Sequence, residues 1–378
     1  MNWRRLITAI CLLPVLGGCE IEPNLHLRKV VETKVVLQTS VTADVMWQVD
    51  WQAQWHYSWL PEIHGEIGYT PPEGMRLHLF TLGDNGKPKS HNRYNFHGTS
   101  GQMEIFEGIH HMLFHNNDSE VLIFTAEDEL SPDIEATTRI LPKSLKPSSP
   151  VRTAEQKAAS TKTDLDEIDE PVANMPDELY TLYDSNRMVT DNPDDYEYVD
   201  GKYVLRIHGE LHPSSFIYLF QIKLLNNLDR VSGSEGAVLT GVARSVNMRT
   251  GVTSTEKVGV PGPVYLNGAA DPDMLGCRMI CFGVPGCNPY DEASVATAPE
   301  GRNWFVLNVC FKTGKYKNIR VDVTDKIRAL PTGGVISLEI DVGDFPPEET
   351  DPPIENGGGF QALIGGWGEE IGETTITY

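Results

Sequence analysis

The sequence predicts an all-β protein made of two β-sandwich domains in tandem. Short apolar runs recur about every ten residues with turn residues between them, which is typical of a β-sandwich. A proline-rich, acidic stretch over 143–178 separates two strand-rich parts, and 378 residues is a usual length for two domains. No long amphipathic helix is visible in the pattern.

The N-terminus has the form of a targeting segment. An Arg4-Arg5 pair precedes an apolar run over 6–16, which is too short to cross a bilayer core of about 30 Å as a helix. The motif Leu16-Gly17-Gly18-Cys19 then matches a lipobox. It predicts cleavage between Gly18 and Cys19, and attachment of several acyl chains to Cys19 gives a stable outer-membrane anchor. The alternative is an ordinary secretory signal that contains a cysteine.

The stretch over 143–178 reads as an exposed linker, because it lacks aromatic residues and carries the acidic run 164–170. The expected domain organisation is a signal peptide, an anchor segment, a first sandwich, a linker and a second sandwich, at 1–18, 19–40, 41–142, 143–178 and 179–378.

Apolar and polar residues alternate without a break over 45–59, and Trp47, Trp51, Trp55 and Trp59 all fall on the apolar side. The tryptophans are four apart and would also share one helix face. The unbroken period of two favours a long strand whose aromatic face is buried. Stacking of exposed aromatic side chains on sugars is the functional alternative.

Further strands are predicted where apolar runs end at turn residues. They cover 75–82, 101–106, 109–116, 121–126, 203–207, 216–225, 236–246, 304–313, 319–323 and 335–342, with a candidate last strand at 374–378. A short helix is expected at 325–330.

The charge balance excludes one class of partner. The chain has 53 acidic and 31 basic residues and a net charge of −22. Such a surface repels nucleic acid and anionic headgroups, so no nucleic-acid partner is expected. Membrane attachment is therefore expected through the lipid and not through a basic patch.

Four cysteines remain outside the targeting segment, namely Cys277, Cys281, Cys287 and Cys310. In an oxidising compartment an even number predicts two disulfides, in any of three pairings. Buried thiols and a zinc site are the alternatives, although the spacing is not that of paired C-x2-C zinc ribbons.

Histidines and acidic residues form two clusters that resemble metal sites. His110, His111 and His115 lie in a predicted strand, where positions four apart are about 13 Å from each other, too far for one ion. The acidic cluster at 191–195 lacks a calcium-loop pattern and reads as a solvated surface. Catalytic motifs were not found, so we expect no enzyme, no metal and no cofactor.

Several short motifs together resemble a known family. They are the lipobox, PEGMRLHLF at 72–80, the turn and strand at 101–116, PDELY at 176–180, and GGGF at 357–360 with Trp367. The sequence resembles the fimbrillin-like superfamily of surface lipoproteins, most closely the fimbrial anchor or assembly proteins of type V pili. The late cysteines and the acidic linker have no counterpart in that resemblance.

The resemblance implies two transthyretin-like Greek-key β-sandwich domains in tandem and no enzymatic activity. It also implies a place at the cell surface, anchored in the outer membrane, with fimbrial subunit proteins as partners. Such proteins associate by strand addition, in which a strand of one subunit completes the open sheet edge of another. Retention of Cys19 favours an anchor over a stalk subunit. A surface lipoprotein that binds glycan or a host protein is the alternative function.

Overall fold

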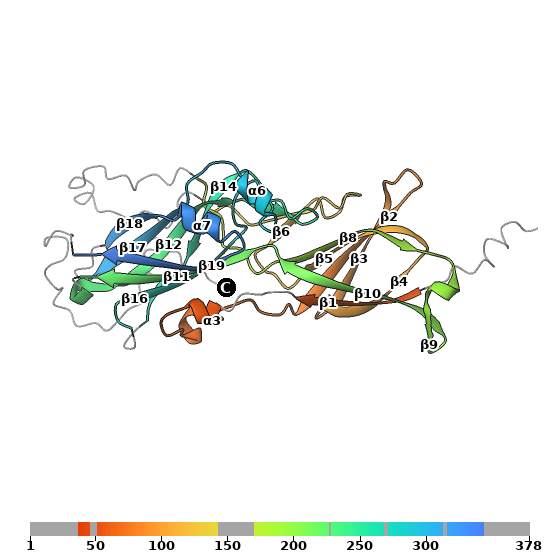
Figure 1. Cartoon of the computed structure of the whole chain (residues 1–378), viewed down its shortest axis with the longest axis horizontal. Helices are drawn as coiled ribbons and strands as arrows, with labels where there is room; N and C mark the ends of the chain where they lie inside the picture. The colour runs from red at the N-terminus through yellow and green to blue at the C-terminus, as the bar shows by residue number, and fades with distance from the viewer. Residues whose placement is uncertain are drawn as a thin grey trace, which may run out of the picture.

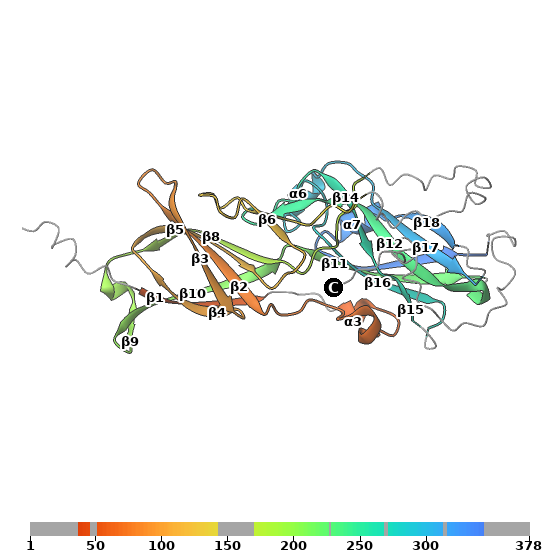
Figure 2. The same ribbon diagram turned by 180° about the vertical axis from the view of Figure 1, so that it is seen from behind.

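The computed structural model describes residues 37–45, 51–142, 170–226, 228–267, 271–312 and 316–343. Two β-sandwich units lie end to end along the long axis of the molecule (Figures 1 and 2), and the predicted all-β class is confirmed. Within the described residues, no helix combines the length and the apolar character that crossing a membrane requires. The predicted signal peptide and the candidate strand at 374–378 lie outside these residues.

The first unit is an eight-stranded sheet in the order β3-β2-β5-β8-β10-β1-β4, with β9 paired to β10. β10 meets β8 through only two residue pairs, at His212 and Pro213, and the two halves of the sheet enclose one core. The strands are β1 (Leu37–Val45), β2 (Gly74–Leu82), β3 (Pro88–His97), β4 (Ser100–Ile105), β5 (Gly108–Asn116), β8 (Tyr180–Val189), β9 (Glu197–Val199) and β10 (Lys202–Pro213).

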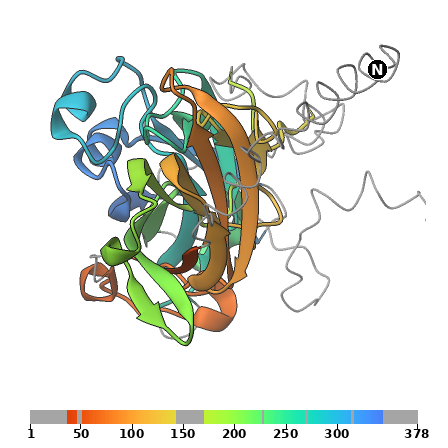
Figure 3. The same ribbon diagram turned by 90° about the vertical axis from the view of Figure 1, so that its right-hand side faces the viewer.

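The core of the first unit is filled from both halves of the sheet. Leu77 of β2 and Phe114 of β5 pack in one cluster with Ile105 of β4 and Leu211 of β10, and all four are buried. Alternate residues of a strand face the same side, which is why these apolar positions alternate with more polar ones along β4 and β10. In the end-on view of Figure 3 this unit is nearest the viewer.

The second unit packs two four-stranded sheets, in the orders β15-β16-β11-β19 and β14-β12-β17-β18. Phe220 and Phe305 stack between them with ring centroids 4.2 Å apart. The strands are β11 (Phe216–Leu225), β12 (Val231–Ala243), β14 (Lys257–Gly262), β15 (Tyr265–Leu266), β16 (Met274–Cys281), β17 (Trp304–Phe311), β18 (Tyr316–Asp322) and β19 (Gly334–Asp341). The helices of this part are η3 (Leu228–Arg230), α6 (Glu292–Ala296) and α7 (Thr324–Ala329).

A small third sheet, in the order β13-β7-β6, has its own buried cluster, to which Phe80 and Leu113 of the first unit and Phe282 of the second also belong. Its strands are β6 (Ile123–Thr125), β7 (Glu135–Thr137) and β13 (Ser245–Asn247). Because β13 comes from the later part of the chain, this sheet joins segments that are more than a hundred residues apart.

The strand pairing differs from the expected domain boundary at residue 179. β8 pairs with β5 and β10 pairs with β1, so 180–213 hydrogen-bonds with the first unit, and the second unit starts at β11. Strand periodicity shows that a strand exists but carries no information about its partner. In the expected linker, Val172 is buried and forms a bridge with Gly259, while 143–169 lies outside the described residues.

The prediction of one strand over 45–59 is wrong. β1 ends at Val45, α3 (Trp51–Gln54) is a helical turn, and 46–50 lies outside the described residues. The predicted burial is confirmed for Trp51 and Trp55, which pack in one cluster with Ile217, Leu219 and Ile280 of the second unit. The four-residue spacing, which also fits a helix, placed both rings on one side. A second short helix, α4 (Pro61–His64), follows.

The other predicted strands agree with β2, β4, β5, β6, β10, β11, β12, β17, β18 and β19, and the predicted helix at 325–330 agrees with α7. Among the longer strands, the sequence patterns missed β3, β14 and β16 and gave no range for β8. β3 was missed because its residues are mostly polar and only Phe96 is buried. β3 is an edge strand, where polar side chains on both faces are tolerated.

Candidate functional site

The N-terminal strand β1 has a hydrogen-bonded neighbour on each side. It runs parallel to β10 from Gln38↔Val204 to Val45↔Leu211, and antiparallel to β4 from Leu37↔Ile105 to Thr42↔Ser100. β1 is therefore an interior strand of its sheet. The predicted lipidation site Cys19 and cleavage residue Gly18 lie outside the described residues.

The two predicted disulfides are not formed. Cys277, Cys281 and Cys287 are free and buried, so the alternative of buried thiols describes them, and no disulfide links them to Cys310. Cys277 and Cys281 lie four apart on β16, a separation of about 13 Å that no disulfide spans. Cys310 lies on β17, where its thiol donates a hydrogen bond to Asn308 Oδ1.

Burial makes these thiols unreactive. It raises the pKa of Cys281 to about 12 and that of Cys277 further, and it also raises the pKa of Cys287. A thiolate is the reactive form, so at pH 8 we expect iodoacetamide to leave all three unmodified in the native protein and to label them in guanidinium without reductant. Mass spectrometry of the peptides measures this. Labelling in guanidinium only after reduction would instead demonstrate disulfides.

The three clustered histidines lie on β5, as predicted, and have different partners. His110 donates from Nε2 to the Phe106 carbonyl at 2.9 Å, and His111 Nδ1 accepts from the Asn186 amide at 3.2 Å. His115 is fully buried and its Nδ1 donates to the Asn116 carbonyl at 2.7 Å. The motif itself therefore does not form a site.

His115 instead joins a row of three histidines on adjacent strands. Its Nε2 atom lies 3.1 Å from Nε2 of His78 on β2, and Nδ1 of His78 lies 2.9 Å from Nε2 of His91 on β3. These residues are diagonal neighbours across the β2–β5 and β2–β3 ladders, a geometry that brings long side chains into contact.

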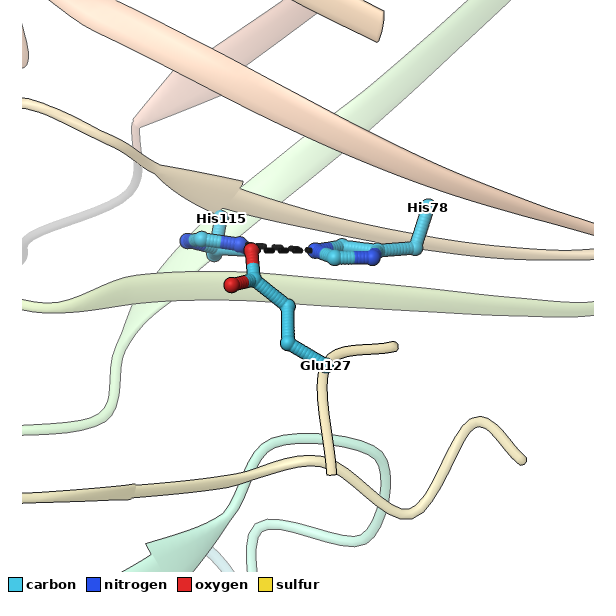
Figure 4. A group of neighbouring side chains, drawn as sticks. All are labelled: His78, His115 and Glu127. Atoms are coloured by element: carbon cyan, nitrogen blue, oxygen red, sulfur yellow. Dashed lines mark hydrogen bonds and ion pairs between the residues drawn. The ribbon is translucent and has the colours of Figure 1, made fainter. Parts of the chain in front are cut away.

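Glu127 completes this histidine cluster from the loop between β6 and β7. Its Oε1 atom lies 3.6 Å from His78 Nε2, and the nearest ligand atoms of His78, His115 and Glu127 all lie within 4.8 Å of one another. Figure 4 shows the carboxylate beside the contact between the two rings. Arg76 pairs with the same carboxylate oxygen.

The rings of His78 and His115 are neutral at physiological pH. Burial, with the neighbouring His115 and His91, lowers the pKa of His78 to about 2. Burial lowers the pKa of His115 to about 4, against the opposing effect of its bond to the Asn116 carbonyl. Both rings therefore present unprotonated nitrogens, the form that binds metal ions. Sequence reasoning found only His115, because the other members come from separate segments and meet through strand register.

A largely buried ion pair lies where the two units meet. Glu178, two positions before the start of β8, pairs with Arg278 of β16, and their side chains are only 13% and 17% exposed. The other carboxylate oxygen, Oε2, accepts hydrogen bonds from the Thr70 amide at 2.7 Å and from the Tyr180 hydroxyl at 2.7 Å. Arg278 also donates to the Gly68 carbonyl at 3.2 Å. This network links three segments of the chain across the junction.

A cavity of about 230 Å³ also opens near this junction. It has aromatic and polar lining residues that include Tyr183, His212, Arg249, Asn288 and Tyr290. The acidic cluster at 191–195 lies elsewhere, in and before the 3₁₀ turn η2 (Pro193–Asp195). Its side chains are exposed, and that of Asn192 caps the turn by accepting from the Asp194 amide. That arrangement agrees with the predicted solvated surface.

One family model matches the chain, over residues 64–261, and is described as a domain of unknown function, DUF5119. The chain belongs to the DUF5119 family. The match starts just before β2 and runs through β14, so this DUF5119 member carries the family domain across the junction between its two sandwich units. It includes the histidine cluster and Glu178.

Solved structures similar to this DUF5119 protein include a proposed adhesin from Bacteroides ovatus. The two chains are 15% identical, the match covers 85% of this chain and 94% of the adhesin, and the TM-score is 0.48. The fimbrial anchor protein Mfa2 from Porphyromonas gingivalis has 11% identity, with 80% and 90% covered and a TM-score of 0.40. Proposed polysaccharide-binding proteins from Bacteroides thetaiotaomicron have 9% identity, with 82% and 92% covered and a TM-score of 0.44.

One curated protein, isopenicillin N synthase from Streptomyces microflavus, is 29% identical over 85 residues. The match covers 20% of this chain and 25% of that protein, so the chain spans about a quarter of the length of this relative.

Proposed function

We propose that this protein is a non-catalytic surface lipoprotein that anchors a fimbrium, or serves as an accessory subunit, and binds a fimbrial subunit by β-strand addition. The observation that carries the proposal is the interior position of β1, with hydrogen-bonded neighbours on both sides. β1 begins 18 positions after Cys19, so it connects the predicted lipid to the middle of a sheet.

This connection suits a protein that bears force. A pull between the membrane and the body would load β1 along its axis, against β10 on one side and β4 on the other. Both ladders would then be sheared, with their hydrogen bonds resisting together, because inter-strand bonds run across the strand direction. A chain that kept its lipid and this strand would hold a filament at the surface.

The partner strand requires an open sheet edge, and β19 supplies one. It is the last strand of its sheet, it pairs with β11 over eight residues, and no other strand among the described residues adds to its outer side. Ile336, Leu338 and Ile340 are buried, while Glu339 and Asp341 are exposed. An incoming strand would thus meet unpaired backbone groups beside a fixed core.

The register of β19 identifies which backbone groups face outward. The amide of Val342 donates to the Leu225 carbonyl of β11 at 2.9 Å. Successive amides along a strand point to alternate sides, so the amides of Ser337, Glu339 and Asp341 point away from β11. The side chain of Ser337 accepts a hydrogen bond from Gln221 and that of Asp341 accepts from Asn226, which leaves Glu339 as the position for a test.

Glu339→Pro removes one outward amide and leaves the ladder to β11 intact, since proline is tolerated on an edge strand when its nitrogen faces outward. Cells carrying this variant are expected to lose attached fimbriae, as counted by electron microscopy. Glu339→Ala, the matched control, keeps the amide and should retain them. Attached fimbriae at the wild-type level in a stably folded Glu339→Pro variant would contradict strand addition at β19.

The second candidate function is binding of a glycan or host protein, and the cavity near Tyr290 is the observation that favours it. Its aromatic and polar lining would suit one sugar ring. The cavity measures about 230 Å³, which is smaller than the roughly 300 Å³ at the low end of ligand pockets. We therefore rank this function second.

A further inference from the structure

We propose that His78, His115 and Glu127 bind a zinc ion, which fixes the loop between β6 and β7 onto the first unit. Two ligands come from the adjacent strands β2 and β5 and the third comes from that loop. This inference does not depend on the fimbrial role.

The positions of the ligand atoms fit one ion. Zinc binds histidine nitrogens at about 2.0–2.1 Å in tetrahedral geometry, which places two such nitrogens roughly 3.3 Å apart. The Nε2 atoms of His78 and His115 are 3.1 Å apart, and Glu127 Oε1 is 3.6 Å from the first of them. Small side-chain rotations would bring all three to one point, and in Figure 4 both rings and the carboxylate converge there.

The hydrogen-bond partners of the rings fit this ligand set. The row runs from the Asn116 carbonyl through His115 and His78 to His91. Because a carbonyl only accepts, His115 donates from Nδ1 to Asn116, so its Nε2 atom carries a lone pair. That lone pair faces Nε2 of His78, the second proposed ligand atom.

A zinc ion would use these atoms together. Glu127 lies beside the contact of His78 with His115, so zinc there would take one lone pair from each Nε2 atom and one from the carboxylate. His115 would then keep its Nδ1–H bond to Asn116, and His78 would donate Nδ1–H to His91. Such partners usually orient zinc-bound histidines.

The surroundings orient the third ligand and leave a path for the ion. Arg76 holds the Glu127 carboxylate, and Arg93 lies 3.8 Å from its other oxygen and 3.0 Å from Asp128. The Glu127 side chain is 20% exposed, so the ion can enter from the loop side. The two arginines reduce the attraction for a cation, so an affinity below that of a four-cysteine site is expected.

The test uses the untagged full chain, titrated with Zn²⁺ by isothermal calorimetry and with Co²⁺ by visible absorption. We expect one ion per chain and the intense visible bands of tetrahedral cobalt. His115→Gln and Glu127→Gln should each weaken zinc binding at least about tenfold. His111→Gln, on the same strand but outside the cluster, should bind like the wild type.

Circular dichroism shows whether each variant folds, and Glu127→Gln keeps the test decisive if the buried His115→Gln fails to fold. The absence of stoichiometric zinc binding in the wild type would overturn the proposal. Binding that survives unchanged in a folded Glu127→Gln variant would overturn it as well. A loss in His111→Gln equal to that in Glu127→Gln would place the ion elsewhere.

Discussion

Glu178→Ala is expected to lower the free energy of unfolding by about 3–5 kcal/mol, because it leaves the Arg278 guanidinium buried without its counter-charge. The carboxylate also accepts hydrogen bonds from the Thr70 amide and the Tyr180 hydroxyl, so its removal breaks these two bonds as well. Arg278 already has one buried nitrogen, Nε, with no hydrogen-bond partner. Urea denaturation followed by circular dichroism measures the difference.

The matched control for this prediction is Glu197→Ala. Glu197 pairs with Arg206 at 3.0 Å, but both side chains are about three-fifths exposed, at 62% and 60%. Water screens such a pair, so its loss should cost no more than about 1 kcal/mol. Equal effects of the two substitutions would show that burial of the junction pair contributes nothing.

A double variant separates the charge from the packing. Replacing both partners, as Glu178→Leu with Arg278→Met, removes the uncompensated charge and keeps most of the volume. Buried pairs replaced in this way often lose little stability, so the double variant should be more stable than Glu178→Ala alone. A double variant that is less stable than Glu178→Ala would mean that the pair is needed for its hydrogen bonds and not only for charge balance.

The sequence predicts individual strands well because their side chains alternate. The segment from Phe216 to Leu225 has apolar residues on both faces and forms β11, which is covered on both faces. The run 335–342 alternates between apolar and polar residues and forms the edge strand β19. In both cases the pattern along one strand reflects directly what lies on its two faces.

Pairing between distant strands is what the sequence does not contain. β8 pairs with β5 although Gly108 and its partner Val189 lie about eighty positions apart in the sequence. The residue pattern of neither strand indicates which strand it pairs with. The histidine cluster has the same origin, since His78 and His115 meet only because β2 and β5 are adjacent. The tryptophans of 45–59 fit both periods, and packing against Ile217 and Ile280 determined the outcome.

Cys19→Ala is expected to abolish acylation and to move the protein from the membrane to the soluble fraction. The lipobox predicts Cys19 as the site of attachment. Each buried CH₂ group contributes about 0.8 kcal/mol to membrane binding, so several acyl chains anchor the protein, and a protein without acyl chains is released from the membrane. The folded body should be unchanged, because the strand β1 begins only at Leu37. Incorporation of labelled palmitate and sucrose-gradient fractionation measure the two effects.

The matched control is Cys310→Ala, which removes a thiol from β17 and should keep both the label and the membrane fraction. Equal labelling of the Cys19→Ala variant and the wild type would refute lipidation at this residue. The strand β1 would then have no fixed end, because shearing β1 against β10 and β4 requires that the preceding segment be held. Loss of the label from Cys19→Ala, together with detached fimbriae, would instead connect the lipid, the interior strand and the filament in one path of force.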